Sequence, residues 1–301
     1  MSGYIESQLV ILCLSIIYAY GIFLPASSGQ LNLGAAGFIT LGAYASGWFN
    51  AGSGLGLPLG ASILISMAFT GGIAFLISFP ILRTRGVYMV LATFAFAEVV
   101  SGLAINMEFL GGAAGMPVDS HAPIGLVAPI TVAVILFCLY LMSTRLGLAL
   151  RSIHDDESVA TLFGIDVRTA KVAAATLGGM LMGLGGALYG HHYNYIEAQT
   201  FNVLLSIYIL LYVLLGGTQT AWGPIVGAAF FTVVPEAIRQ AANEMGLKWL
   251  ADGRFILFGA FIVLMMVFRP EGVVTRTLQD RCAAALSGRR RSRAATSETP
   301  S

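Results

Sequence analysis

Long apolar runs separated by short polar turns dominate this chain. A helix that crosses a bilayer needs about 20 apolar residues, so each such run predicts a transmembrane helix. The runs predict helices over residues 8–27, 31–50, 60–80, 87–107, 124–143, 170–190, 202–216, 223–238 and 254–268. The pattern therefore predicts an all-α, polytopic integral membrane protein with about 8–9 transmembrane helices.

The predicted helices 202–216 and 223–238 are short, and a glycine-rich turn from Gly216 to Pro224 joins them. This pattern favours a broken or re-entrant hairpin, which a membrane tolerates only where the backbone is buried in protein or lines a cavity. A similar glycine-rich turn follows Gly29. Paired interrupted helices often lie near the substrate path of transporters, although glycine also simply permits tight turns.

Composition agrees with a membrane protein. The 301 residues are 57% hydrophobic and 10% charged, with a mean hydropathy of +0.82, whereas a soluble domain carries about 25% charged residues. The net charge of +1 gives no reason to expect a nucleic-acid partner. The three cysteines lie far apart in the sequence, so neither a disulfide framework nor a metal site is expected.

The distribution of Lys and Arg predicts the orientation, because cytoplasmic loops carry an excess of these residues. With the carboxyl terminus inside, the inner cations are Arg83, Arg85, Arg145, Arg151, Arg168, Lys171, Arg269, Arg276, Arg281, Arg289, Arg290, Arg291 and Arg293. The outer cations are then only Arg239, Lys248 and Arg254. We therefore expect the amino terminus outside and the carboxyl terminus in the cytoplasm.

Two regions follow from this pattern. Residues 1–274 are expected to form the transmembrane domain, with an inner loop at about 144–169. Residues 275–301 are polar and arginine-rich, and are expected to form a disordered cytoplasmic tail. The arginine run in this tail is interpreted as a topology anchor on anionic lipid, with a specific binding site as the alternative.

The inner loop is the one long charged interruption between apolar runs. Asp155 and Asp156 are suited to cap a short helix with Glu157 in its first turn, and Gly164 is placed to end it. Val159, Leu162 and Phe163 would share one face of that helix. An exposed apolar face usually meets a partner groove; the alternative is a helix lying on the bilayer surface.

Several segments resemble branched-chain amino-acid ABC importer permeases, and within that family the LivM-type subunit. The segments stand in family order from about residue 29 to 274. They are GQLNLGAAGFITLGAY, RTRGVYMVLATFAFAEVV, RLGLALRSIHDDESVATLFGIDV, GGTQTAWGPIVGAAF and FRPEGVV. The resemblance implies a permease of the bacterial inner membrane that works with a second, LivH-type permease, two cytoplasmic ATPases and an extracytoplasmic substrate-binding protein.

The resemblance also implies a function for the inner loop. It would receive the motion of the ATPases, with Asp155, Asp156, Glu157, Val159, Leu162, Phe163 and Gly164 as the coupling residues. The solute would be leucine, isoleucine or valine, or a related small solute such as urea or an amide. No phosphate-binding GxxxxGK[ST] motif occurs, so ATP is expected on partner subunits, with no cofactor and no enzyme activity on this chain.

Polar residues within the apolar runs are candidates for the translocation pathway: Asn32, Thr40, Tyr44 and Glu98. Glu98 is the one ionisable residue well inside a predicted span, where a carboxylate must face the helix bundle or a wet cavity. Hydrogen bonding between helices is the alternative for all four. Ion-coupled secondary transport, or a channel, is the alternative function, and Glu98 would be its only ion-coupling candidate.

The run from Lys171 to Gly190 contains small residues at four-residue spacing, which lets helix backbones approach closely. His191 and His192 follow it. Neighbouring residues point to different sides of a helix, so we expect surface positions for these two histidines rather than a metal pair.

Overall fold

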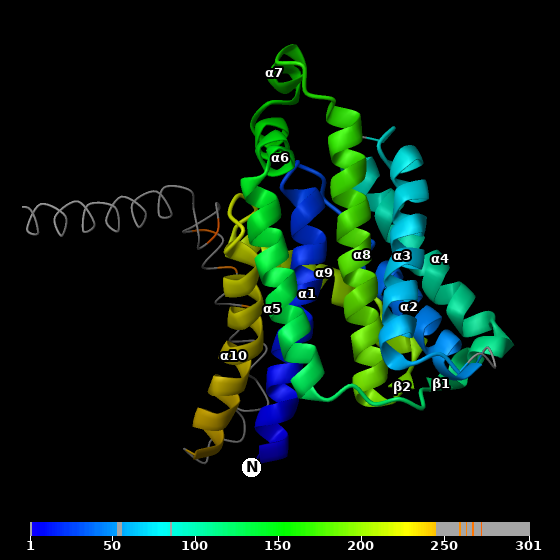
Figure 1. Ribbon diagram of the computed structural model, residues 1–301. Helices are drawn as coiled ribbons and strands as arrows, with labels where there is room; N and C mark the ends of the chain where they lie inside the picture. Colours follow the sequence, from blue (N-terminus) through cyan, green and yellow to red (C-terminus); the bar gives the residue numbers. More distant parts are fainter. Residues whose placement is uncertain are drawn as a thin grey trace, which may run out of the picture.

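The computed structural model describes residues 2–52, 56–84 and 86–244, with the single positions 259, 263, 267 and 272. Ten α-helices make up most of these ranges (Figure 1). They are α1 (Ser2–Ala26), α2 (Ala35–Gly47), α3 (Leu59–Ile81), α4 (Val87–Asn106), α5 (Ile124–Ser143), α6 (Arg145–Asp155), α7 (Glu157–Leu162), α8 (Val167–Tyr193), α9 (Val203–Gly216) and α10 (Gly223–Glu244). The tail 275–301, and the predicted helix 254–268 apart from three of the single positions, lie outside the described residues.

The all-α prediction is confirmed. Among the described residues, α1, α3, α4, α5 and α8 are long and apolar enough to cross a membrane, by length and composition. In the same part of the chain, the only β structure is an antiparallel ladder between β1 (Met116–Pro117) and β2 (Tyr195–Ile196). The α9 helix has only 14 residues, or about 21 Å at 1.5 Å per residue, so the total of 8–9 spans stays a prediction.

The second predicted helix, 31–50, is wrong in its extent. Residues 30–34 are not helical, α2 begins at Ala35, and a π-helix from Trp48 to Gly52 follows it. The non-helical entry is stable because side chains bond its backbone. The Leu33 amide donates to Thr93 Oγ1 at 3.0 Å, and the Ala36 amide donates to Ser206 Oγ at 2.8 Å. This segment is thus an interrupted helix start buried in protein, as the bilayer requires.

The α8 helix lies at the centre of the bundle, between α1 and α5 on one side and α2 and α3 on the other (Figure 1). Glycines allow the backbones of α8 and α2 to approach each other closely. A methyl group at Gly186 would overlap the backbone carbonyl of Ile39, and one at Gly42 would overlap the backbone of Gly183. The predicted role of the small residues of α8 in close packing is therefore confirmed, and α2 rests directly on its backbone.

The two ends of the bundle differ in their number of Lys and Arg residues. The α6–α7 end carries Arg145, Arg151, Arg168 and Lys171, together with Arg83 in the turn that joins α3 to α4. At the opposite end, Arg239 of α10 bonds Glu236 and the Tyr4 hydroxyl. The grouping is the one on which the predicted orientation rests, and the orientation itself stays a prediction.

We predict that Gly186→Leu destabilises the protein by about 1–3 kcal/mol, because the new side chain must displace the α2 backbone rather than a flexible side chain. Gly72→Leu is the matched control. Gly72 lies on α3, and a methyl group there would meet no atom within 4 Å. Unfolding of the purified protein in mixed detergent micelles would measure both changes. Equal losses for the two variants would contradict the central role of the α8 backbone.

Candidate functional site

The inner loop folds into two helices that are anchored to the bundle by a small apolar core of their own. Leu150 and Ile153 of α6 pack with Ala160 of α7 and with Ala170 and Ala174 of α8. The α6 helix was not among the predicted helices. The spacing of Leu146, Leu150 and Ile153 along a short amphipathic segment would have indicated it.

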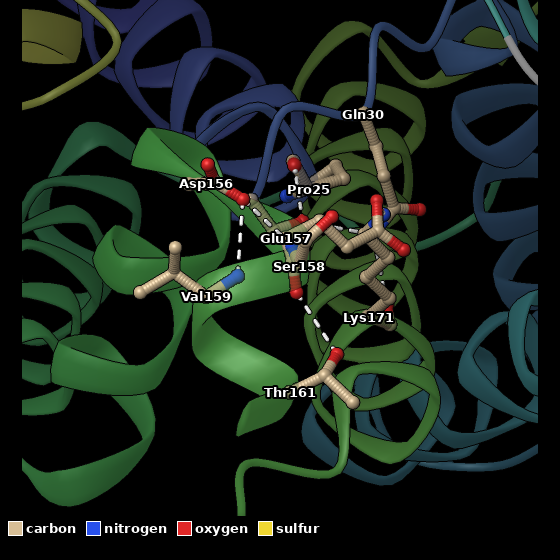
Figure 2. Close-up of polar contacts among 9 residues, drawn as sticks. Pro25, Gln30, Asp156, Glu157, Ser158, Val159, Thr161 and Lys171 are labelled. Carbon is tan, nitrogen blue, oxygen red and sulfur yellow. Dashed lines mark hydrogen bonds and ion pairs between the residues drawn. The ribbon is translucent and has the colours of Figure 1, made fainter. Parts of the chain in front are cut away.

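The predicted cap of α7 is confirmed at Asp156. Its carboxylate accepts hydrogen bonds from the amides of Ser158 at 2.8 Å and Val159 at 3.0 Å (Figure 2). Gly164 follows the helix with a φ of +81°, a left-handed conformation that suits glycine. Asp155 instead ends α6, where it is the last residue. The local signals therefore located α7 to within a residue.

The apolar residues of this helix project away from the molecule. Leu162 is 86% exposed and Phe163 82% exposed, and Val159 is 45% exposed. We call Val159, Leu162 and Phe163 the α7 patch. Contact with water is unfavourable for an exposed apolar cluster, so such a cluster usually binds a partner. The caps at both ends of α7 stabilise the helix that presents it. The α7 patch is therefore suited to bind an apolar groove, and what covers it stays a prediction.

Glu157 bonds within its own chain. Its carboxylate pairs with the Lys171 ammonium at 2.7 Å, and the backbone carbonyl of Lys171 accepts a hydrogen bond from the Gln30 side chain at 3.2 Å (Figure 2). Gln30 also bonds the Ser28 hydroxyl at 2.9 Å. A pair with a half-exposed carboxylate contributes only about 0–1 kcal/mol. The ion pair joins α7 to α8, and the Gln30 bond joins α8 to the segment that leads into α2.

The start of α8 is fixed by a second cap. Asp166 accepts hydrogen bonds from the Thr169 amide at 3.1 Å and the Thr169 hydroxyl at 2.6 Å. These bonds lower the pKa of the Asp166 carboxyl, because they stabilise its ionised form. Lys171 therefore extends from a well-ordered helix start beside the α7 helix.

Three of the four candidate pathway residues lie on or just before α2. Asn32 lies in the non-helical segment before α2, where its side-chain oxygen accepts a hydrogen bond from the Gly34 amide at 2.6 Å. Thr40 is buried and donates to the Ala36 carbonyl at 2.7 Å. Tyr44 is 3% exposed, and its hydroxyl has no hydrogen-bond partner, although the Ala198 backbone lies beside it. The structure thus places Thr40 and Tyr44 on α2 and Asn32 in the segment just before it.

Thr40 and Tyr44 line a cavity of about 460 Å³ between α2, α3 and α4. Its other walls are almost entirely apolar: Leu41, Ala45, Trp48, Phe49, Phe69, Val100, Leu103, Ala104, Met107, Phe109 and Leu110. Ligand pockets are commonly apolar with a few placed polar groups. With two hydroxyl-bearing residues on its wall, this cavity is a candidate for contact with a small apolar solute.

Glu98 lies elsewhere. It is exposed on α4, whereas Thr93, Ala97 and Val100 of the same helix are buried against the bundle. It does not line the cavity that holds Thr40 and Tyr44. A role of Glu98 in the pathway stays a prediction, and this chain alone does not bring it to the other three residues.

The expectation of a surface position for His191 is wrong. His191 is 1% exposed, and its ring nitrogens lie 2.6 Å from the Ser46 hydroxyl and 2.7 Å from the Ser120 hydroxyl. It holds the segment before α5 against the end of α2. Its partners are distant in the sequence, so spacing alone gave no signal for this contact.

Comparison with known families and proteins places the chain. Residues 4–269 match the family described as branched-chain amino acid transport system / permease component. The high-affinity branched-chain amino acid transport system permease protein LivM of Escherichia coli is 29% identical over 286 residues, which cover 83% of this chain and 65% of that protein. The chain thus spans about two thirds of the length of this relative.

Two archaeal proteins are also similar. The probable branched-chain amino acid transport permease protein LivM of Methanocaldococcus jannaschii is 26% identical over 73% of this chain and 69% of its own length. The probable LivH permease protein of the same organism is 24% identical over 60% of this chain and 58% of its own length. No solved structure matches this chain.

We predict that Asp156→Ala loosens α7, because two amides at its start lose their acceptor. Loss of such a cap costs about 0.5–2 kcal/mol. Hydrogen exchange of the amides of residues 157–163 should therefore become about twofold to thirtyfold faster. Asp156→Asn is the control, since asparagine caps a helix as well as aspartate does. Equal exchange in the two variants would contradict the role of Asp156 as a cap.

Proposed function

Since the chain belongs to the family of permease components of branched-chain amino acid transport systems, we propose that it is the membrane-spanning subunit of an ATP-driven importer of branched-chain amino acids. Its homologues are transport permease components and not enzymes. The proposed solute is leucine, isoleucine or valine, or a related small solute such as urea or an amide. The mechanism is alternating access, and ATP is bound and hydrolysed on separate subunits.

The α7 patch is the observation that supports this function most strongly. Leu162 and Phe163 are among the most exposed apolar residues in the described chain, and they sit on a helix with both ends fixed. Such a rigid apolar projection beside the membrane fits the groove of a partner protein. We assign that groove to a cytoplasmic ATPase, with Asp155, Asp156 and Glu157 at the margin of the contact.

A chain of contacts would carry the motion of the ATPases to the solute. Movement of α7 acts on Glu157, which is paired with Lys171, and the Lys171 carbonyl is bonded to Gln30. Gln30 opens the non-helical segment before α2, and α2 carries Thr40 and Tyr44 on the wall of the cavity. ATP must bind one conformation more tightly than the other, because only a difference in affinity shifts the equilibrium.

The cavity beside α2 is proposed as the solute contact. Branched aliphatic side chains require apolar walls, and this cavity of about 460 Å³ supplies them with two hydroxyl-bearing residues. The tyrosine hydroxyl is buried and without a partner. A passing polar group of the solute, or its hydration water, would supply that missing hydrogen bond.

The remaining parts of the proposal concern the assembly. The α6–α7 end faces the cytoplasm of a bacterial cell and the amino terminus faces outside, in keeping with the excess of cations at the α6–α7 end. A second, LivH-type permease completes the membrane part, and an extracytoplasmic binding protein delivers the solute. Two ATPases dock at the α6–α7 end.

We predict that a charge in the α7 patch uncouples the importer. In Leu162→Asp and Phe163→Asp, the carboxylate would be buried against the ATPase groove, which costs about 2 kcal/mol or more at the centre of an interface. Association would weaken roughly thirtyfold. Co-purification of the ATPases and ATP-dependent uptake in vesicles containing the full complex would measure the loss.

Leu148→Asp is the matched control for charge near the membrane. Leu148 is 56% exposed but lies on α6, outside the α7 patch. It should leave co-purification unchanged. Normal ATPase binding and uptake in both patch variants would exclude the docking role. Uptake that ignores ATP and collapses with an ion gradient would favour secondary transport instead.

We predict that Tyr44→Phe lowers uptake about twofold to twelvefold without lowering stability. Loss of one hydrogen bond to the solute costs about 0.5–1.5 kcal/mol, whereas removal of an unpaired buried hydroxyl costs the fold nothing. Tyr20→Phe is the control with the opposite expectation. The Tyr20 hydroxyl donates to the Ala221 carbonyl at 2.8 Å, so its loss should reduce stability and leave uptake per folded complex unchanged. Unchanged uptake in Tyr44→Phe would remove Tyr44 from the pathway.

A further inference from the structure

Glu98 occupies an unusual position for a carboxylate. It lies eleven residues from Val87, the cytoplasmic end of α4 in the proposed orientation. At 1.5 Å per residue this is about 16 Å along the helix, close to the middle of an apolar layer roughly 30 Å thick. Yet Glu98 is exposed, and the described part of the chain offers it no hydrogen bond or ion pair. A carboxylate at this depth is not stable against lipid tails.

The residues around Glu98 extend the same face. Leu91 and Ala95 precede Glu98 at helical spacing, and Gly102 follows it. Leu91 is 55% exposed, Ala95 is exposed, and a methyl group added at Gly102 would meet no atom within 4 Å. Small residues beside a polar one are typical of the contact between two membrane helices. We call Leu91, Ala95, Glu98 and Gly102 the outer face of α4.

We propose that the outer face of α4 binds a helix of the second permease subunit, and that this helix presents a hydrogen-bond donor or cation to Glu98 within the membrane. The proposal rests on the proposed function, which supplies a second permease. It assigns to Glu98 a contact between subunits rather than a contact within this chain.

Charge complementarity selects the second permease over a second copy of this chain. Two copies that met through this face would bring two Glu98 carboxyl groups together, and such a pair is costly unless one of them takes up a proton, because neither carboxylate offers the other a hydrogen-bond donor. A different subunit is free to offer a donor at the same depth. In keeping with a distinct partner, Methanocaldococcus jannaschii has both a LivM and a LivH permease protein similar to this chain.

The test uses the assembled complex of both permeases and the ATPases, with a photoreactive benzoylphenylalanine at Leu91. Its matched control carries the same group at Val132, which is 53% exposed on α5 and lies eleven residues from Ser143, at the depth of Glu98. We expect the group at Leu91 to cross-link to the second permease and the group at Val132 to cross-link to lipid. A cross-link from Leu91 to lipid, to a second copy or to another segment of this chain would overturn the proposal.

Substitution of Glu98 gives an independent measurement. Glu98→Gln keeps an acceptor and should retain the second permease, whereas Glu98→Leu should recover about threefold to tenfold less of it. Full recovery with Glu98→Leu would overturn the hydrogen bond.

The unsubstituted complex distinguishes failure of the proposed function from failure of the outer-face contact. If it fails to co-purify the second permease or to take up solute, the proposed function falls and the outer-face contact falls with it; if both succeed, the variants judge the contact alone.

Discussion

The fold depends on how closely other helices approach the backbone of α8. At Gly186 of α8 and at Gly42 of α2, the backbone of the other helix lies so near that no side chain fits between the two helices. Gly178 has the same relation to Gly21 of α1. In a membrane, apolar side chains gain little by leaving lipid, so close backbone packing is a main source of helix association. The glycines of α8 therefore hold together helices that burial of apolar surface alone would not.

This packing makes an interrupted α2 tolerable. A helix that begins inside the bundle leaves amides without partners, and each of these is costly in an apolar surrounding. Thr93 and Ser206 bond two of the amides around the start of α2. Both come from helices that the bundle brings beside this start. The broken segment is thus stable only in the assembled fold, and it is also the segment that Gln30 connects to the Lys171 backbone.

The parts of the structure that depend on local chemistry were predictable from the sequence. Long apolar runs located most of the helices, and the order of Asp156, Glu157 and Gly164 located α7 with its caps. The start of α2 was not predictable, because hydropathy does not distinguish a helix from an extended apolar segment. The partners of that segment lie 60 residues away at Thr93 and 170 away at Ser206. His191 was mispredicted for the same reason.

Glu98 illustrates how the two kinds of information combine. Its sequence position established only that a carboxylate lies deep in an apolar run, with this chain's own bundle or a cavity as the expected surroundings. The structure turns the residue away from that bundle, while the cavity beside α2 has its polar groups on another helix. The physical requirement for a partner is unchanged by this orientation. If the chain itself does not meet the requirement, another subunit must, and the permease is then complete only as part of an assembly.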